Sequence, residues 1–311
     1  MHKRDAITSR SAGLSIAGVH FISFLSTDVP SYPPSFRSFA GAPLSSDLTC
    51  EVSVLGPDDS LIEESLAPSK PWAFTVCNNV CEVIRRNQEG EVLWKFSGAL
   101  DFESTTISWN PLRFGDFFGS YEQAWSTGLG LSLLVLRLRA HGGLVLHGTA
   151  ANIDGQGILC VGISGKGKST LARLLDTAGA TVLTDERPVL RQWPPPTAGT
   201  APSKDFRVYG SPWPSSAGFA HNAWAPLRRI YFIEHGDADQ ITPMLPRDAV
   251  NRLIHVATIP WQDPVLLDPY LTTVNMLLQS IPCAVLSFRP TAAVMDVIRA
   301  DLRRPIKEAC P

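Results

Sequence analysis

At Gly162-Ile163-Ser164-Gly165-Lys166-Gly167-Lys168-Ser169-Thr170, the sequence matches the phosphate-binding loop pattern G-x-x-x-x-G-K-[ST] at every fixed position. The pattern is informative only where a strand precedes the loop and a helix follows it. Residues 157–161 form a short apolar run typical of a strand, and residues 169–175 have helical periodicity that stops before Gly179. Both flanks are therefore present, which argues against a glycine-rich turn that matches by chance.

The loop predicts that the protein binds a nucleoside triphosphate with Mg²⁺. Glycines let backbone N–H groups converge on phosphate oxygens without Cβ clashes, and the following helix directs its positive dipole end at the same anion. Lys168 supplies a mobile cation for the phosphates, and the Ser169 hydroxyl is placed to bind Mg²⁺. The predicted nucleotide-binding residues are Gly162, Ser164, Gly165, Lys166, Gly167, Lys168, Ser169 and Thr170.

Two adjacent carboxylates, Asp185 and Glu186, follow residues 180–184, a run typical of a strand. Phosphoryl transfer needs a metal ligand and a proton acceptor at the carboxyl end of a strand near the phosphate loop. The alternative is an acidic loop start, since Asp commonly begins turns. Only one helix and one short strand separate the pair from Ser169, so the chain can return to the phosphates, which favours a functional role.

The composition limits the partners that we expect. Charged residues make up 18% of the 311 residues, and the net charge is -2. Nucleic acid and anionic membranes both attract clustered basic residues, so neither is an expected partner. No run of 18 apolar residues occurs, which argues against a membrane-spanning helix. The pairs Arg137/Arg139 and Arg303/Arg304 are short and are interpreted as solvated surface.

The cysteines and the N-terminal sequence favour the cytoplasm. The six cysteines lack zinc-site spacing, and Cys160 and Cys283 lie in apolar runs typical of a core. A reducing compartment is the simplest interpretation. A secretory signal is the alternative for residues 1–19, but charged residues such as Arg10 interrupt its pattern.

We expect two domains from the length. Residues 1–12 are predicted to be a disordered arm, and residues 13–120 a small antiparallel β-rich domain made of short runs divided by turn residues. Within it, residues 87–90 are predicted to form a hairpin turn. Residues 121–140 are predicted to form a mostly buried helix that bridges into a second domain, residues 141–311, which carries the phosphate loop.

The chain reaches the loop in an unusual way. Residues 143–152 are predicted to form one strand, and Asp154-Gly155 a hairpin turn that leads into the strand before the loop. Parallel nucleotide-binding sheets normally alternate strand and helix, whereas here an antiparallel hairpin delivers the chain to the loop.

Beyond the acidic pair, Arg228 and Arg229 precede a clear strand at residues 230–233. An arginine there could reach a transferring phosphoryl group, and a surface role is the alternative. The remaining predicted elements complete the sheet and its cover; they are helices at 248–257, 264–280 and 291–302 and a strand at 283–288.

The run from His147 to Glu186 resembles the catalytic domain of HPr kinase/phosphorylase, a bacterial serine kinase whose fold is related to phosphoenolpyruvate carboxykinase. The matching features are the histidine-bearing strand, the hairpin at Asp154-Gly155, the loop and the acidic pair. The resemblance implies an α+β or α/β fold, in which an N-terminal antiparallel β-rich domain precedes a P-loop kinase domain of this type. It also implies that ATP and Mg²⁺ are used.

Carried over by position, the resemblance implies that Lys168 holds the phosphates and that Ser169 and Glu186 bind Mg²⁺. Asp185 would take the base role toward the acceptor hydroxyl, and His147 would assist by orienting the carboxylates. Judged without the resemblance, a lone histidine on a strand is more often a satisfied core residue.

Two features depart from the family pattern. The acidic pair of the family is usually Asp-Asp, so Glu186 is longer than expected, and the family's later signature for phosphorolysis and HPr recognition is absent from this sequence. Residues 210–214 and 225–227 instead resemble a divergent group associated with ribosomally made peptides, including lasso peptides. Members of that group look like kinases of a precursor-peptide serine.

The expected function is therefore ATP- and Mg²⁺-dependent phosphorylation of a hydroxyl, with a serine of a peptide or small protein as acceptor. Two other functions stay open: a nucleotide-dependent binding module or scaffold ATPase in a peptide-maturation system, and a small-molecule kinase. Because the HPr enzymes form hexamers, a homo-oligomer is also left open.

Overall fold

The structure, a computed structural model, describes residues 10–25, 32–41, 48–54, 72–109, 125, 128–163, 165–197, 199, 201, 203–261 and 263–305. The chain divides into two compact units. The first unit is Met1–Arg137 with Pro260–Val265, and the second is Leu138–Ile259 with Leu266–Pro311. The predicted nucleotide-binding residue Ser164 and most of the predicted arm lie outside the described residues.

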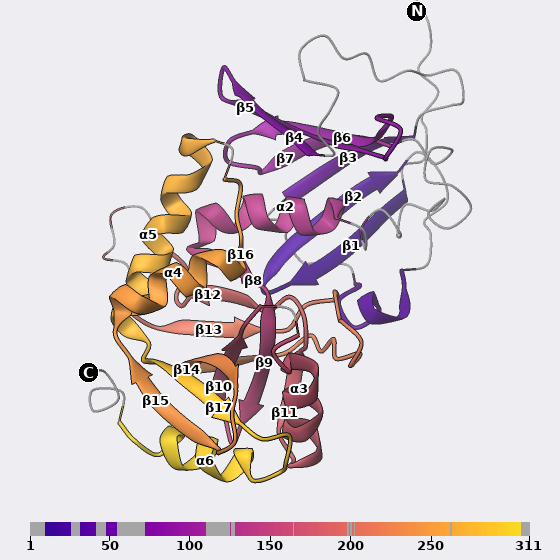
Figure 1. Ribbon diagram of the computed structural model, residues 1–311. Helices are drawn as coiled ribbons and strands as arrows, with labels where there is room; N and C mark the ends of the chain where they lie inside the picture. Colours follow the sequence, from indigo (N-terminus) through magenta and orange to yellow (C-terminus); the bar gives the residue numbers. More distant parts are fainter. Residues whose placement is uncertain are drawn as a thin grey trace, which may run out of the picture. The chain divides into compact units, whose positions relative to one another are not determined.

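The first unit is built on a seven-stranded sheet in the order β1-β2-β3-β7-β6-β5-β4 (Figure 1). A short 3₁₀ helix, η1 (Pro34–Phe36), follows β2 in the chain. The strands are β1 (Arg10–Ile16), β2 (Val19–Leu25), β3 (Leu48–Val54), β4 (Trp72–Cys77), β5 (Val80–Arg86), β6 (Val92–Ala99) and β7 (Ser104–Trp109). The predicted β-rich domain is thus present, but the prediction of an antiparallel sheet is wrong, because β3 pairs in parallel with both β2 and β7.

Local sequence explains these strands well. In β6, Val92, Trp94 and Phe96 alternate with partly exposed residues, as expected for a sheet with one covered face. The predicted turn at 87–90 joins β5 to antiparallel β6 and is held by the Asn87 side chain, whose Oδ1 accepts from the Glu91 N–H at 2.8 Å. The predicted arm is wrong in its last three residues, because β1 begins at Arg10 and pairs with β2.

The predicted bridging helix is shorter than expected. The helix α2 (Leu129–Leu138) begins directly after Gly128, whose φ of +128° does not belong to a helix, and the 3₁₀ turn η3 (Arg139–His141) follows it. Residues 121–124 of the predicted helix lie outside the described residues. Arg137 is buried rather than solvated as predicted, because its guanidinium donates to the carbonyl of Asp101 at 2.6 Å.

The second unit contains a mixed sheet in the order β11-β9-β10-β14-β13-β12-β8-β16, with β17 beside β14 and β15 beside β17. Its strands are β8 (Gly143–Leu146), β9 (Gly148–Ile153), β10 (Gln156–Val161), β11 (Thr181–Thr184), β12 (Val189–Gln192), β13 (Phe206–Tyr209), β14 (Trp224–His235), β15 (Gln240–Met244), β16 (Ala257–Thr258) and β17 (Cys283–Phe288). The hairpin predicted at Asp154-Gly155 joins β9 to β10, and both turn residues have positive φ. Because β10, β14 and β17 run parallel, their carboxyl ends meet at one edge.

The helices of this part of the chain are α3 (Lys168–Thr177), α4 (Pro246–Val256), α5 (Pro264–Ser280) and α6 (Val294–Leu302). Buried residues of α3 and α6, among them Leu171, Leu175 and Ile298, form one core cluster with Cys160 and Leu286 of the sheet. Each leucine or isoleucine side chain of this cluster contributes about 1.5–3 kcal/mol when it is fully buried. Within the described part of the chain, none of the helices has the length and apolarity needed to span a membrane.

A buried ion pair ties β14 to α6. The Arg229 Nε donates to Asp301 Oδ2 at 3.0 Å, and the Tyr231 hydroxyl donates to the same oxygen at 2.9 Å. Burial and the neighbouring Asp301 charge both raise the pKa of Tyr231, so its hydroxyl keeps its proton. Removing the carboxylate would leave a buried guanidinium and a buried hydroxyl without an acceptor.

We therefore expect Asp301→Ala to lower the free energy of unfolding of this unit by about 3–5 kcal/mol. The matched control is Arg299→Ala, which removes an exposed ion pair to Asp154 (3.3 Å) and should cost about 1 kcal/mol or less. Urea unfolding of both variants measures the difference. Equal effects of the two substitutions would contradict this account of the buried pair.

Candidate active site

The glycine-rich loop has the strand–loop–helix geometry that its sequence pattern requires. It follows β10, and α3 begins at Lys168. Gly165 and Gly167 have φ of +82° and +88°, a region that glycine enters without a Cβ penalty. The first N–H groups of α3 have no acceptor within the helix, so they are available to an anion held in the loop.

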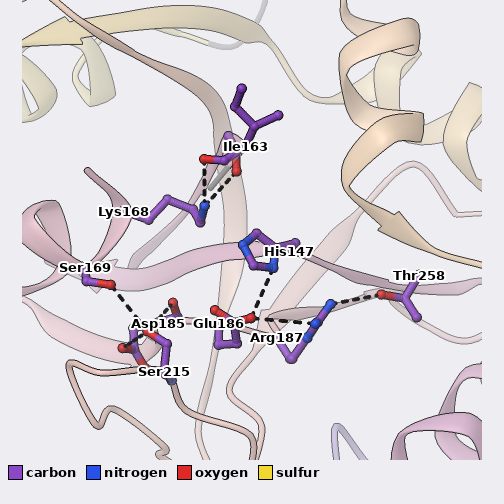
Figure 2. A network of polar contacts seen from close by, with 10 residues as sticks. His147, Ile163, Lys168, Ser169, Asp185, Glu186, Arg187, Ser215 and Thr258 are labelled. Carbon is purple, nitrogen blue, oxygen red and sulfur yellow. Dashed lines mark hydrogen bonds and ion pairs between the residues drawn. The ribbon is translucent and has the colours of Figure 1, made fainter. Parts of the chain in front are cut away.

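Lys168 is folded back over the loop (Figure 2). Its Nζ donates to the carbonyl oxygens of Gly162 at 2.7 Å and Ile163 at 3.0 Å. Burial lowers the pKa of Lys168; Glu186 opposes this shift and Arg187 adds to it. A phosphate would offer this ammonium a charged acceptor in place of the two carbonyls.

Asp185 is fully buried and lies on the Ser169 side of the site. Its carboxylate accepts from the Ser215 hydroxyl (2.6 Å), the Ser215 N–H (3.1 Å) and the Ala217 N–H (2.9 Å). The Ser215 hydroxyl also lies 3.3 Å from the Ser169 hydroxyl. We call Ser169, Asp185 and Ser215 the Asp185 cluster; in it, Ser215 links one carboxylate to the predicted metal-binding hydroxyl.

Glu186 faces the other way and is only partly buried. Its Oε1 lies 3.1 Å from His147 Nδ1 and 3.6 Å from Arg187 Nη2, and Arg187 Nη1 also donates to the Thr258 hydroxyl at 3.3 Å (Figure 2). We call His147, Glu186 and Arg187 the Glu186 cluster. Because a carboxylate only accepts hydrogen bonds, this contact places the proton of a neutral His147 on Nδ1 and leaves Nε2 as an acceptor.

Two adjacent chain crossings bring the clusters together. The chain passes from β8 to β9 at His147 and from β11 to β12 through residues 185–188; β8 pairs with β12, and β9 pairs with β11. The Gly148 N–H donates to the Glu186 carbonyl at 3.1 Å, which fastens one crossing to the other. The prediction of one continuous strand at 143–152 is therefore wrong, because the chain changes pairing partners at His147.

The structure brings together the predicted catalytic and metal-binding residues Lys168, Ser169, Asp185, Glu186 and His147. Lys166 and Gly162 line a neighbouring pocket, and Thr170 lies exposed on the first turn of α3. The suggestion that Arg229 reaches a phosphoryl group is wrong, because it is buried against Asp301.

Ser215 is the site residue that we did not predict. Residues 210–214, just before Ser215, resemble the divergent group, which drew attention to this segment. No local pattern, however, predicts that a serine 30 residues after Asp185 contacts the Asp185 carboxylate.

A pocket of about 340 Å³ lies beside the loop. Val161, Ile163, Phe232 and Val256 give it apolar walls, and its rim carries polar groups, including Asn251, Arg252 and His255. Arg252 is held at the rim by an ion pair with Glu234 of 2.6 Å. The pocket is large enough for a nucleoside, and its lining suits a flat, apolar group better than a charged one.

The donors at the site fit Mg²⁺ in kind. Ser169, Asp185 and Glu186 supply only oxygen, which Mg²⁺ prefers, and Mg²⁺ is usually held by one or two carboxylates together with substrate phosphates. Among the described residues, no group of three or more His, Cys, Asp and Glu side chains could hold a metal.

Comparison with known proteins adds little evidence about function to that of the site itself. No family model matches the chain, and no curated protein matches it. One similar solved structure is the Hpr(Ser) kinase/phosphatase from Coxiella burnetii, with 11% identity, 50% of this chain and 95% of that chain covered, and a TM-score of 0.28.

Burial lowers the pKa of His147 below its usual 6.5; Lys168 and Arg187 lower it further, while Glu186 opposes the shift. The folded state therefore prefers the neutral imidazole. The contribution of His147 to the stability of the folded state is fully present above pH 6.5. It is lost as the pH falls from 6.5 through the lower pKa that His147 has in the folded state.

We expect an NMR titration of the metal-free protein to give His147 a pKa below 6.5, with His147→Gln identifying its signal. Glu186→Gln removes the charge that opposes the shift and should lower this pKa further. A pKa above 6.5 in the wild-type protein, or a rise in Glu186→Gln, would contradict the assigned electrostatics.

Proposed function

We propose that this protein is an ATP- and Mg²⁺-dependent phosphotransferase whose acceptor is a hydroxyl, a serine of a peptide or small protein. The observation that carries the proposal is the convergence of Lys168, the Ser169 hydroxyl and two carboxylates beside a glycine-rich loop. Phosphoryl transfer depends mainly on positioning and on neutralising charge, and these groups supply both.

Ser169 and Asp185 would hold Mg²⁺, which when bound neutralises charge on the phosphates. The sequence-based assignment gave the metal to Glu186 and the proton to Asp185. The contacts support exchanging these roles, because Asp185 is linked through Ser215 to Ser169, while Glu186 is held by His147. Ser215 fixes the Asp185 carboxylate in place and is a positioning residue.

The Glu186 cluster would accept the proton of the acceptor hydroxyl. The neutral imidazole of His147 donates from Nδ1 to Glu186, so Nε2 can take the proton. As the acceptor oxygen bonds to the γ-phosphorus, the bond to the β-phosphate oxygen breaks and ADP leaves. Glu186 stabilises the imidazolium that forms, and Lys168 stabilises charge on the phosphates.

The apolar pocket beside the loop would hold the nucleoside. Its lining reaches Gly162 and Lys166 in the loop, so a nucleotide with its phosphates in the loop could place its base there. With this pocket used by the nucleotide, the acceptor must approach from outside, which supports a peptide over an enclosed metabolite.

The test of the function is intact-mass analysis of candidate acceptor peptides after incubation with the protein, ATP and Mg²⁺. We expect a gain of one phosphate on a Ser or Thr, and we expect Lys168→Ala to abolish it because the loop loses its cation. Lys204→Ala is the matched control, since this lysine is exposed and lies outside the site, and it should retain full activity.

No gain on any acceptor, with Mg²⁺-ATP still bound, would overturn the transferase proposal in favour of a binding module. Transfer to a metabolite but to no peptide would instead favour the small-molecule kinase.

The two carboxylates can be told apart by conservative variants. We expect Asp185→Asn to raise the Mg²⁺ concentration for half-maximal transfer by roughly tenfold or more, because a metal ligand loses its charge. Glu186→Gln should change that Mg²⁺ concentration by no more than about twofold. It should lower kcat by roughly 10²-fold, because His147, the proton acceptor, loses its carboxylate partner.

Initial rates over a range of Mg²⁺ concentrations measure both effects. The reverse pattern, with the larger Mg²⁺ effect in Glu186→Gln, would restore the assignment made from the sequence.

A further inference from the structure

Two arginine pairs that are distant in the sequence meet in one pocket. Arg228 and Arg229 of β14 lie with Arg303 and Arg304, just after α6, around a cavity of about 220 Å³ that Gln156 also lines. No pattern in the sequence predicts that these pairs lie together. The pocket, which we call the arginine pocket, gathers four arginines in a chain whose net charge is -2.

Arg229 holds the pocket together rather than facing a ligand. Besides Asp301, its guanidinium donates to the carbonyl oxygens of Arg228 (2.9 Å), Asp301 (3.0 Å) and Arg304 (2.8 Å). It thus fixes both chain segments that carry the other arginines. Because Asp301 balances its charge, Arg229 stabilises the walls of the pocket but adds little net positive charge to it.

Within the described residues, the positive charge of the remaining arginines is not balanced by nearby carboxylates. Arg228, Arg303 and Arg304 are exposed, and within the described residues only Arg304 approaches a carboxylate, at 3.9 Å from Asp301. That carboxylate already accepts from Arg229 and Tyr231. The three guanidinium groups therefore have donors available around the cavity.

Stabilisation of a helix end does not explain the cluster. Cations are common at helix C-termini, where carbonyl oxygens lack partners. Here Arg229 already donates to the carbonyls of Asp301 and Arg304, and Arg228 belongs to a strand. A helix-end role thus accounts for neither the pairing of the segments nor the cavity between them.

The arginine pocket is separate from the candidate active site. Gln156 begins β10 and lines this pocket, whereas the glycine-rich loop follows the other end of β10 at Val161. A strand of this length spans roughly 16 Å, at 3.3 Å per residue. An anion in one site would not contact the other.

We propose that the arginine pocket binds a small phosphorylated anion. Guanidinium forks match phosphate oxygens with paired hydrogen bonds, and several arginines facing one cavity favour a dianion over a single carboxylate. The volume of about 220 Å³ admits a phosphate with a small group attached. The proposal holds whether or not the protein transfers phosphate.

The test uses inorganic phosphate and diphosphate as probes in calorimetric titrations of the full chain. The titrations are made in Lys168→Ala, so that the glycine-rich loop contributes little. We expect one binding event that the double variant Arg228→Ala/Arg303→Ala weakens at least tenfold. Both side chains are exposed, so the thermal midpoint should not change.

The matched control is Arg247→Ala, which removes an exposed arginine of α4 outside the pocket and should leave the affinity unchanged. The proposal is overturned if Lys168→Ala binds neither probe. It is equally overturned if the double variant changes the affinity by less than twofold, or if Arg247→Ala weakens binding as much as the double variant does.

Discussion

The candidate site depends on a constraint in the second sheet: β8 and β9 are consecutive in the chain but pair with different strands. The consecutive strands β11 and β12 are divided in the same way, since β11 pairs with β9 and β12 pairs with β8. The β8–β9 and β11–β12 connections must therefore run beside each other. The Gly148 N–H and the Glu186 carbonyl fasten them with a hydrogen bond of 3.1 Å. His147 therefore meets Glu186, and the neighbouring Asp185 is linked through Ser215 to Ser169.

The proposed roles of the two carboxylates rest on their surroundings. Asp185 is fully buried, and three hydrogen bonds from Ser215 and Ala217 satisfy its charge and fix its position. Such a rigid carboxylate suits metal binding. Glu186 is more exposed and is partnered by an imidazole that burial keeps neutral, and this pair can accept a proton and then stabilise the resulting charge.

Much of the fold could be predicted from local patterns. The strand before the loop, α3 with its stop at Gly179, the hairpin at Asp154-Gly155 and the span of α5 are confirmed, because each depends on nearby residues. Sheet pairing depends on distant residues, and the parallel pairing of β3 and the break at His147 were therefore missed. Motif spacing was enough to predict the candidate site residues in the glycine-rich loop and the acidic pair. The position of Ser215 and the meeting of the two arginine pairs could be seen only in the tertiary structure.

The most direct test is a crystal structure of the protein with Mg²⁺ and a non-hydrolysable ATP analogue. We expect the phosphates in the glycine-rich loop, Lys168 released from its two carbonyls and bonded to phosphate, and the metal in contact with Ser169 and Asp185. His147 should face the γ-phosphate. A nucleotide bound away from the loop, or a metal held without Ser169 and Asp185, would contradict the account.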